Sequence, residues 1–185
     1  MRKVTRADIV DFQTYNDRRE AYRSRVLLEK AKRRIHLGEN LTFLFESTDT
    51  ILYQVQEMMR LEQIVREKDI QHEIDTYNAL LGDQGELGCT LLIEIDDVEE
   101  RNQKLRAWLS LPQHLYLKLE GGGEARALWD TAQMDDTRLS SVQYLKFRVG
   151  GHPPLAIGCD HPALQLETPL SPEQQQTLTA DLQSD

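Results

Sequence analysis

The chain has 185 residues, with 22 Lys and Arg against 31 Asp and Glu, which gives a formal net charge of −9 at pH 7. This length suits one domain that buries a sizeable core. No apolar run reaches the roughly eighteen residues that a membrane-spanning helix needs. An acidic chain with few aromatic residues among its charges also argues against nucleic-acid binding. We therefore expect neither a membrane nor a nucleic acid as a partner.

Two features favour a cytoplasmic protein. The first residues lead directly into a polar segment, without the apolar stretch of a secretory signal. The two cysteines, Cys89 and Cys159, both lie in apolar strand-like runs, where a small buried thiol is expected. Two cysteines without an export signal favour a reducing compartment.

Charge is distributed unevenly along the chain. Residues 1–36 contain 11 Lys and Arg against 5 Asp and Glu, whereas the remaining residues contain 11 against 26. A basic segment before an acidic body can form an anion-binding face, but the more ordinary interpretation is a helix whose cations cover acidic regions of the same domain. We expect one α+β domain over residues 1–170, onto which a basic helical arm of residues 1–36 folds. Residues 171–185 would add a C-terminal helix or tail.

Capping and turn residues outline the elements of the first half. Thr5 and Ser47 are typical N-caps, and Gly38-Glu39-Asn40 has the composition of a hairpin turn. In chain order, the pattern predicts a helix over residues 5–32 with an interruption near residues 14–16, a β-hairpin over residues 33–45, and helices over residues 48–68 and 69–81.

Alternating apolar residues predict mostly strands in the second half, over residues 89–96, 114–120, 142–149, 155–158 and 164–167. Asp96-Asp97 would cap a short helix that ends near Leu109. Ser171 followed by Pro172 would begin a C-terminal helix. Because helices and strands do not alternate regularly, we expect an α+β fold with N-terminal helices, a β-hairpin and a largely antiparallel sheet.

One carboxylate interrupts an apolar stripe. Ile51, Val55, Met58 and Val65 follow the spacing of one helical face, and Glu62 occupies the missing step. A carboxylate that faces a core needs a partner, a shifted pKa or a cavity. Three interpretations stay open: an internal ion pair with an arginine of segment 25–34, a ligand cavity, or a misjudged helix phase. The first two can hold together.

Polar side chains near this helix form the candidate ligand site. They are carboxylates, amides and guanidinium groups that a polar or anionic ligand can use. Two of the carboxylates, Glu46 and Glu94, come at the ends of predicted strands, where side chains often line clefts. The candidate residues are Glu46, Gln54, Glu57, Arg60, Glu62, Glu94, Arg33 and Arg34.

Metal and cofactor motifs are weak. Gly121-Gly122-Gly123 lacks the downstream residues of a phosphate loop or a dinucleotide fingerprint. The pair Asp69 and His72 has no second pair to complete a metal site, and Cys159-Asp160-His161 would point to alternate faces of an extended strand. We predict no cofactor and no metal, with Asp160 and His161 as the first residues to consider if a metal is found.

Several longer blocks resemble a known family. They cover residues 45–62, 70–80, 90–95, 142–147 and 158–162. In these blocks the chain is similar to an uncharacterised bacterial family, domain of unknown function 3501. The resemblance implies a genomic neighbourhood of redox or peroxide-stress genes, and hence an iron–sulfur or flavin oxidoreductase or a rubrerythrin as partner. Members usually carry an aliphatic residue where this chain has Cys159, which argues against thiol chemistry there.

Two functions follow from these observations. The first is a non-catalytic accessory or binding protein of a redox or peroxide-stress system, since no catalytic constellation is evident. The alternative is a small enzyme or ligand-binding domain with an internal pocket around Glu62 lined by Glu, Arg and Gln side chains. An open pocket with unpaired carboxylates would favour the alternative.

Overall fold

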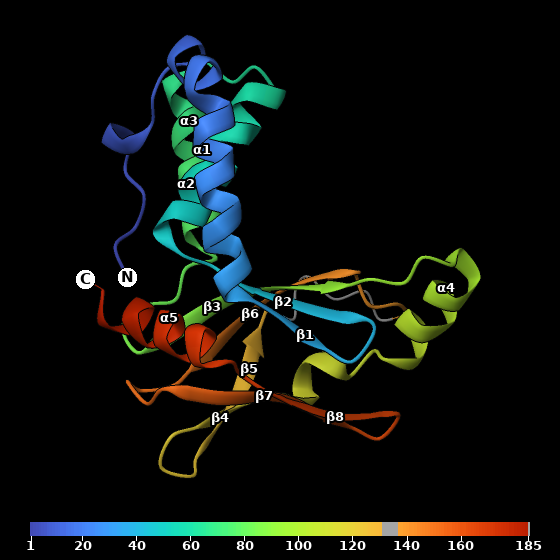
Figure 1. Cartoon of the computed structure of the whole chain (residues 1–185). Helices are drawn as coiled ribbons and strands as arrows, with labels where there is room; N and C mark the ends of the chain where they lie inside the picture. Colours follow the sequence, from blue (N-terminus) through green and yellow to red (C-terminus); the bar gives the residue numbers. More distant parts are fainter. Residues whose placement is uncertain (131–136, 185) are drawn as a thin grey trace.

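Eight strands form one antiparallel sheet in the order β1-β2-β3-β6-β5-β4-β7-β8 (Figure 1). The computed structural model describes residues 1–130 and 137–184. The strands are β1 (Arg34–Leu37), β2 (Leu41–Phe45), β3 (Glu86–Ile93), β4 (Leu115–Leu119), β5 (Glu124–Trp129), β6 (Val142–Arg148), β7 (Pro154–His161) and β8 (Leu164–Pro169). This arrangement confirms the α+β class and the predicted hairpin of β1 and β2.

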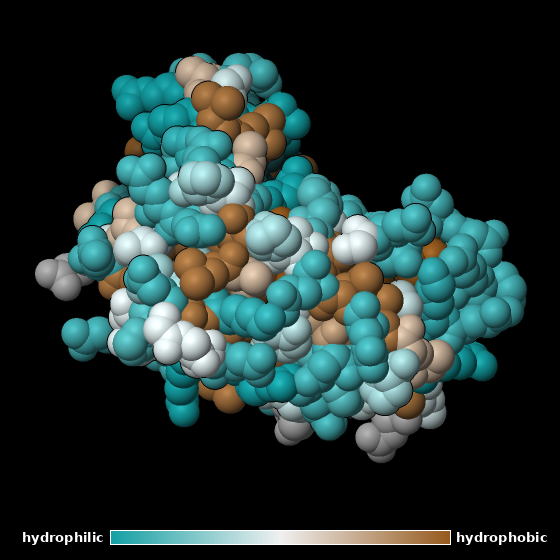
Figure 2. All heavy atoms as spheres, turned by 60° about the horizontal axis from the view of Figure 1, so that its bottom comes forward, coloured by the Kyte–Doolittle hydropathy of each residue, from teal (hydrophilic) through white to brown (hydrophobic). Residues whose placement is uncertain are grey.

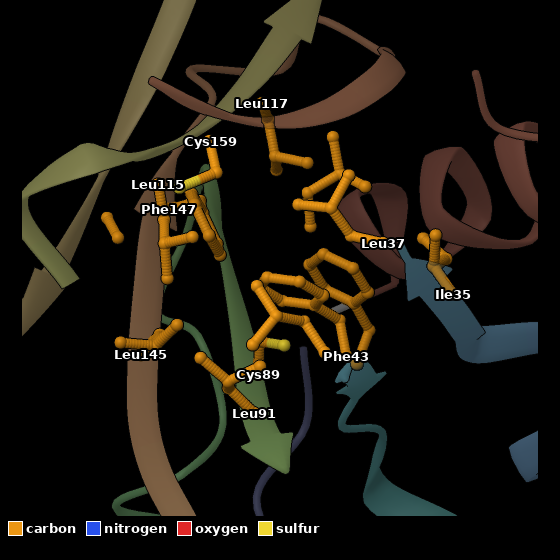
Figure 3. Close-up of a cluster of buried hydrophobic side chains, with 14 of the residues drawn as sticks. Ile35, Leu37, Phe43, Cys89, Leu91, Leu115, Leu117, Leu145, Phe147 and Cys159 are labelled. Carbon is orange, nitrogen blue, oxygen red and sulfur yellow. The ribbon is translucent and has the colours of Figure 1, made fainter. Parts of the chain in front are cut away.

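The sheet curls on itself until its two edge strands meet. Gly38, in the turn after β1, lies so close to Leu166 of β8 that an added Cβ would be 2.6 Å from its Cδ1. The inner face buries one apolar cluster, in which Phe43, Phe147 and both cysteines lie (Figure 3). The rings of Phe45 and Phe147 pack 6.1 Å apart in the same cluster. Apolar burial inside this curled sheet is the main source of its stability.

Three helices stand together on the outer face of the sheet (Figure 1). From here on, the arm means these three helices and not the predicted basic segment of residues 1–36 alone. They are α1 (Phe12–Arg33), α2 (Thr48–Leu61) and α3 (Glu67–Asn78), with a short 3-10 turn η1 (Arg6–Asp8) beside them. A second, smaller apolar cluster holds the arm together, formed by Val4, Ile9, Ile51, Val55, Met59, Ile70, Ile74 and Leu81. The molecule therefore has two cores, one inside the sheet and one inside the arm.

The remaining helices are α4 (Val98–Ala107), η2 (Leu111–His114) and α5 (Pro172–Gln183). α5 packs on the sheet through Leu178, which is fully buried. Residue 185, at the end of the predicted segment 171–185, lies outside the described residues. In the described part of the chain, no helix combines the length and the apolar character needed to cross a bilayer.

Side-chain caps begin the helices at the predicted places. Ser47, Asp97 and Ser171 each accept a hydrogen bond from the backbone N–H three residues later, at the starts of α2, α4 and α5. Each bond satisfies one of the N–H groups that a helix start leaves free. The signal failed for the third helix of the arm, because α3 begins at Glu67 instead of Asp69, after Arg66 and without a side-chain cap.

The prediction for the first helix was wrong in detail. Thr5 and Asp8 form the expected capping box, but it closes only the 3-10 turn η1. The chain is then extended at Ile9, and α1 begins at Phe12 with Asp11 as its N-cap. The interruption therefore lies before Asp11, since residues 14–16 belong to α1 without a break. Strand β5 was not predicted.

The helix that carries the expected inward carboxylate ends early. α2 stops at Leu61, and Glu62 is its C-cap. Gln63 then adopts a left-handed conformation, with φ of 53°. Val65, which seemed to continue the apolar stripe, is 76% exposed. Glu62 is exposed as well, so both the ion pair and the cavity predicted around it are wrong.

A glycine lets the arm approach the sheet closely. A Cβ on Gly88 of β3 would lie 1.8 Å from the carbonyl oxygen of Leu80, which follows α3. Any other residue would push this segment away from the strand. The same glycine accepts a hydrogen bond from the backbone N–H of Glu46, at 2.9 Å. Gly88 thus positions both α3 and the end of β2.

Figure 2 views the molecule with the lower side of Figure 1, where β4, β7 and β8 lie, turned forward. Apolar side chains gather in two areas near the middle of this face, and hydrophilic side chains surround them.

Candidate functional site

A cavity of about 190 Å³ lies between the arm and the outer face of the sheet. Its walls come from α1, α2 and α3 on one side and from β2, β3 and β6 on the other. The side chains with polar groups are Lys30, Glu46, Thr50, Gln54, Tyr77, Thr90 and Tyr144. We call this space the arm–sheet cavity. It contains two of the predicted ligand residues, Glu46 and Gln54.

Glu46 forms the floor of the arm–sheet cavity. It directly follows β2 and is only 8% exposed. One carboxylate oxygen accepts a hydrogen bond from the Thr50 hydroxyl at 2.6 Å, and the other accepts one from the Thr90 hydroxyl at 2.7 Å. These two bonds fix the orientation of the carboxylate and leave each oxygen able to accept another hydrogen bond.

Lys30 brings a positive charge to the same cavity. It lies on α1 and is half-buried, and its Nζ is 5.3 Å from the centroid of the Tyr53 ring. Burial lowers the pKa of Lys30, and the nearby Glu46 opposes this shift. Within the described residues, no carboxylate oxygen lies within 4.0 Å of this ammonium group. Lys30 and Glu46 therefore face one cavity without bonding to each other.

Two tyrosines and an amide complete the polar lining. Burial raises the pKa of Tyr77, and the neighbouring Gln54 opposes the rise. Tyr144 comes from β6, pairs with Thr90 of β3, and is 42% exposed, so it lies where the cavity meets solvent. Phenol and amide groups both donate and accept hydrogen bonds. The lining therefore suits a small polar molecule with groups of both kinds.

The inward carboxylate of α2 is Glu57. It accepts hydrogen bonds from Arg19 Nε at 2.7 Å and Arg19 Nη2 at 2.8 Å, and from the Tyr15 hydroxyl at 2.8 Å. Arg60 Nε lies 3.6 Å from the same carboxylate. The pKa of Glu57 is lowered, chiefly by its hydrogen bonds from Arg19. An ion pair thus joins α1 and α2, similar to the one predicted for Glu62. It is formed by Arg19 and Glu57 instead, and it lies outside the arm–sheet cavity.

The other predicted ligand residues lie elsewhere. Arg33 donates two hydrogen bonds of 2.8 Å to Asp181 of α5 and is buried. Arg34 is exposed on β1. Glu94, after β3, accepts a hydrogen bond of 2.5 Å from the Thr42 hydroxyl. None of the three lines the arm–sheet cavity, so the eight residues predicted as one site are divided among several places. Their roles in ligand binding stay a prediction.

Asp160 and His161 lie at the end of β7, and both are next to His114, whose ring centroid is 5.0 Å from that of His161. Asp160 is exposed and accepts hydrogen bonds from His114 Nδ1 at 2.9 Å and Arg126 Nη1 at 2.7 Å, and Arg126 is the main cause that lowers its pKa. His161 is buried, which lowers its pKa. Within residues 1–130 and 137–184, no three His, Cys, Asp or Glu side chains are grouped to hold a metal ion.

Both cysteines lie in the apolar core as free thiols (Figure 3). Burial raises the pKa of Cys89 well above its usual value and also raises the pKa of Cys159. A raised pKa keeps a thiol protonated and poorly nucleophilic at neutral pH. Both cysteines thus pack as buried members of the apolar cluster.

Sequence reasoning missed Lys30, Tyr77, Thr90 and Tyr144 as lining residues. Lys30 was one of eleven basic residues in the first 36, and nothing in the pattern distinguished it. Thr90 and Tyr144 alternate with buried core residues in β3 and β6, so their position on the outer face was predictable. That these residues line a cavity was not predictable, because it depends on where the arm packs on the outer face of the sheet.

Comparisons with known proteins agree on the family. The model of the family described as protein of unknown function DUF3501 matches residues 3–182. A crystal structure of a protein of unknown function from Burkholderia pseudomallei K96243 is 30% identical, with a TM-score of 0.90 over 98% of this chain and 100% of that one. No curated protein matches. The chain therefore belongs to the DUF3501 family, whose description states no function.

Proposed function

We propose that this protein is a non-catalytic binding protein that takes a small polar molecule into the arm–sheet cavity. The observation that carries the proposal is the pair Lys30 and Glu46, two opposite charges that border one cavity without forming an ion pair. Such a pair suits a ligand that accepts a hydrogen bond from the ammonium group and donates one to the carboxylate.

The size of the arm–sheet cavity restricts the ligand. About 190 Å³ is below the range of about 300 to 1,000 Å³ that holds drug-sized molecules. A small zwitterion with an ammonium and a carboxylate group, such as a short amino acid, fits both the volume and the two charges. The lining residues include no histidine, cysteine or serine, and the hydroxyls of Thr50 and Thr90 are already bonded to Glu46. This composition supports binding over catalysis.

Calorimetric titration tests this proposal with three probes of similar size: L-alanine, propionate and ethylamine. We expect L-alanine to bind and the two singly charged probes to bind at least about tenfold more weakly, since each loses one charged contact. Glu46→Gln and Lys30→Met should both abolish the preference for the zwitterion. Glu39→Gln and Lys68→Met remove the same charges from exposed positions and should leave it unchanged. Equal binding of all three probes, or none, would contradict the proposal.

The wider setting is an accessory role in a cytoplasmic redox or peroxide-stress system. It rests only on the genomic neighbourhood that the family resemblance implies, with an iron–sulfur or flavin oxidoreductase or a rubrerythrin as the proposed partner. A pull-down from native extract, combined with metal and flavin analysis of the bound fraction, tests this part separately. Co-purification of one of these enzymes at a defined ratio would support it. A bound fraction without such an enzyme would contradict the setting and leave the cavity proposal to its own test.

A further inference from the structure

A second hollow also borders α1 and α2. It is a groove of about 410 Å³ between α1, α2 and the extended segment that follows η1. Its volume is within the range of small-molecule sites, about 300 to 1,000 Å³. We call it the arm groove. It shares no lining residue with the arm–sheet cavity.

The walls of the arm groove are mostly apolar. Val10, Ala21 and Leu52 line it, together with the rings of Tyr15 and Tyr22, which pack edge to face 6.1 Å apart. Gln56 fixes the extended segment in place, because its side-chain amide accepts a hydrogen bond from the Val10 N–H at 2.9 Å and donates one to the Val10 carbonyl at 3.3 Å. The groove is therefore held open by bonds within the arm.

Three polar groups at the arm groove lack an anionic partner among the described residues. The Tyr22 hydroxyl is buried and makes no hydrogen bond of ordinary geometry with them, and the nearby Arg25 side chain opposes the rise of its pKa. Arg18 and Arg25, two turns apart on the same face of α1, both border the groove, and no carboxylate lies within 4.0 Å of either one in the described part of the chain. The Arg25 guanidinium lies 5.0 Å from the centroid of the Tyr22 ring. Arg25 and the Tyr22 hydroxyl thus provide donors at one end of an apolar groove.

The one acidic residue of the lining is already neutralised. Asp8 accepts hydrogen bonds of 2.8 Å from Arg2, from the Thr5 hydroxyl and from the Thr5 backbone N–H. These bonds lower the pKa of Asp8 to about 2. Burial raises the pKa of Tyr22 to about 12, so its hydroxyl stays protonated as a donor at neutral pH. The unpaired groups of the arm groove are therefore all donors, and two of them are cations.

We propose that the arm groove binds an amphipathic carboxylate, a small molecule with an apolar body and one anionic head. The body would lie against Val10, Ala21 and Leu52, where it displaces water from apolar surface. The head would accept hydrogen bonds from Arg25 and the Tyr22 hydroxyl, with Arg18 adding positive charge. A planar guanidinium binds a carboxylate with two parallel bonds, and the ligand would satisfy a hydroxyl that is otherwise buried without a partner.

Calorimetry with decanoate, below the concentration at which it forms micelles, tests the proposal. Decanol keeps the apolar body without the charge, and 3-phenylpropanoate separates an aromatic from an aliphatic body. We expect either carboxylate to bind at least about tenfold more tightly than decanol, because decanol cannot form the bonds with Arg25. The carboxylate that binds more tightly identifies the kind of body.

Matched variants locate the contacts. Arg25→Gln should weaken decanoate binding about tenfold or more, whereas Arg23→Gln, which removes an exposed charge from the same helix outside the groove, should change it less than about twofold. Ala21→Trp, at an exposed helical position that borders the groove, should fill it and abolish binding without loss of helical signal.

Tyr22→Phe separates binding from folding. Because its hydroxyl has no partner, its removal should leave the melting temperature of the free protein unchanged or raise it. Decanoate binding should nevertheless weaken about threefold to tenfold. Equal binding of decanol and decanoate, equal effects of Arg25→Gln and Arg23→Gln, or no binding to the unmodified protein would each overturn the proposal.

Discussion

The curled sheet and the helical arm are stabilised in different ways. The sheet encloses a continuous apolar cluster with buried members from seven strands and from α5, and Leu164 and Leu166 of β8 pack against it. The arm has a much smaller apolar cluster, and α1 is held to α2 by the bonds of Glu57 with Arg19 and Tyr15. Both the arm–sheet cavity and the arm groove border the arm. Tight apolar packing thus belongs to the curled sheet, and both spaces proposed for ligands lie beside the helical arm.

The largest expected effect comes from the core of the sheet. Phe43 is fully buried there, so Phe43→Ala should lower the free energy of unfolding by about 3 to 5 kcal/mol, through lost burial and the cavity left behind. Urea unfolding followed by circular dichroism measures it. Leu128→Ala, at a partly exposed position of β5, is the control and should cost much less. Similar losses in the two variants would contradict the tight packing of the apolar cluster inside the sheet.

A smaller effect is expected inside the arm, where α1 is bonded to α2. Glu57→Ala removes the shared partner of Arg19 and Tyr15 and leaves the buried Tyr15 hydroxyl unpaired. We expect a loss of about 2 kcal/mol. Hydrogen exchange should show faster opening of α1, with little change in β3 and β6. Uniform acceleration across the sheet would mean that arm and sheet unfold as one unit.

The same ion pair should make stability depend on pH. The pKa of Glu57 in the folded protein is lowered from its ordinary value of 4.5, chiefly by Arg19. A carboxylate with a lowered pKa stabilises the fold fully above that ordinary value, and this contribution is lost as the pH falls through the lower folded-state value. The difference in unfolding free energy between the unmodified protein and Glu57→Gln should therefore shrink below about pH 4.5. If this difference in unfolding free energy stays constant from pH 7 to about pH 2, the charge of Glu57 does not contribute to the stability of its pair with Arg19.

The smallest effect is expected at the end of the arm. Glu62 is exposed and caps α2 with its backbone only, so Glu62→Ala should change the free energy of unfolding by less than about 0.5 kcal/mol. Thermal melting curves of Glu62→Ala and Glu57→Ala, recorded under the same conditions, compare the two carboxylates directly. A large loss from Glu62→Ala would restore the inward position that the sequence pattern indicated.

The sequence predicted the elements that local chemistry determines. The hairpin follows from Gly38-Glu39-Asn40 between two apolar runs, and the starts of α2, α4 and α5 follow from their capping residues. The end of α2 had no such signal. Gln63 adopts the left-handed conformation that usually calls for Gly or Asn, while Val65 continues the apolar spacing by coincidence.

The candidate site was only partly predictable. Glu46 and Gln54 lie close in sequence around the start of α2, which explains why they were found. Lys30, Tyr77 and Tyr144 come from α1, α3 and β6, and only the packing of the arm on the sheet brings them together. The choice of Glu57 rather than Glu62 as the inward carboxylate likewise depends on where α2 ends.

The bond between Arg33 and Asp181 has a consequence for how the protein is made. These residues are 148 positions apart in the chain, and β1 and β8, the strands that meet at the closed edge, are almost as distant. Contacts of such long range form slowly, because the intervening chain must be ordered before they contribute. A growing chain on the ribosome cannot complete this core until α5 has been synthesised. Until then the apolar inner faces of β1 and β2 stay partly uncovered, and an unfinished chain with such exposed surface is prone to aggregate.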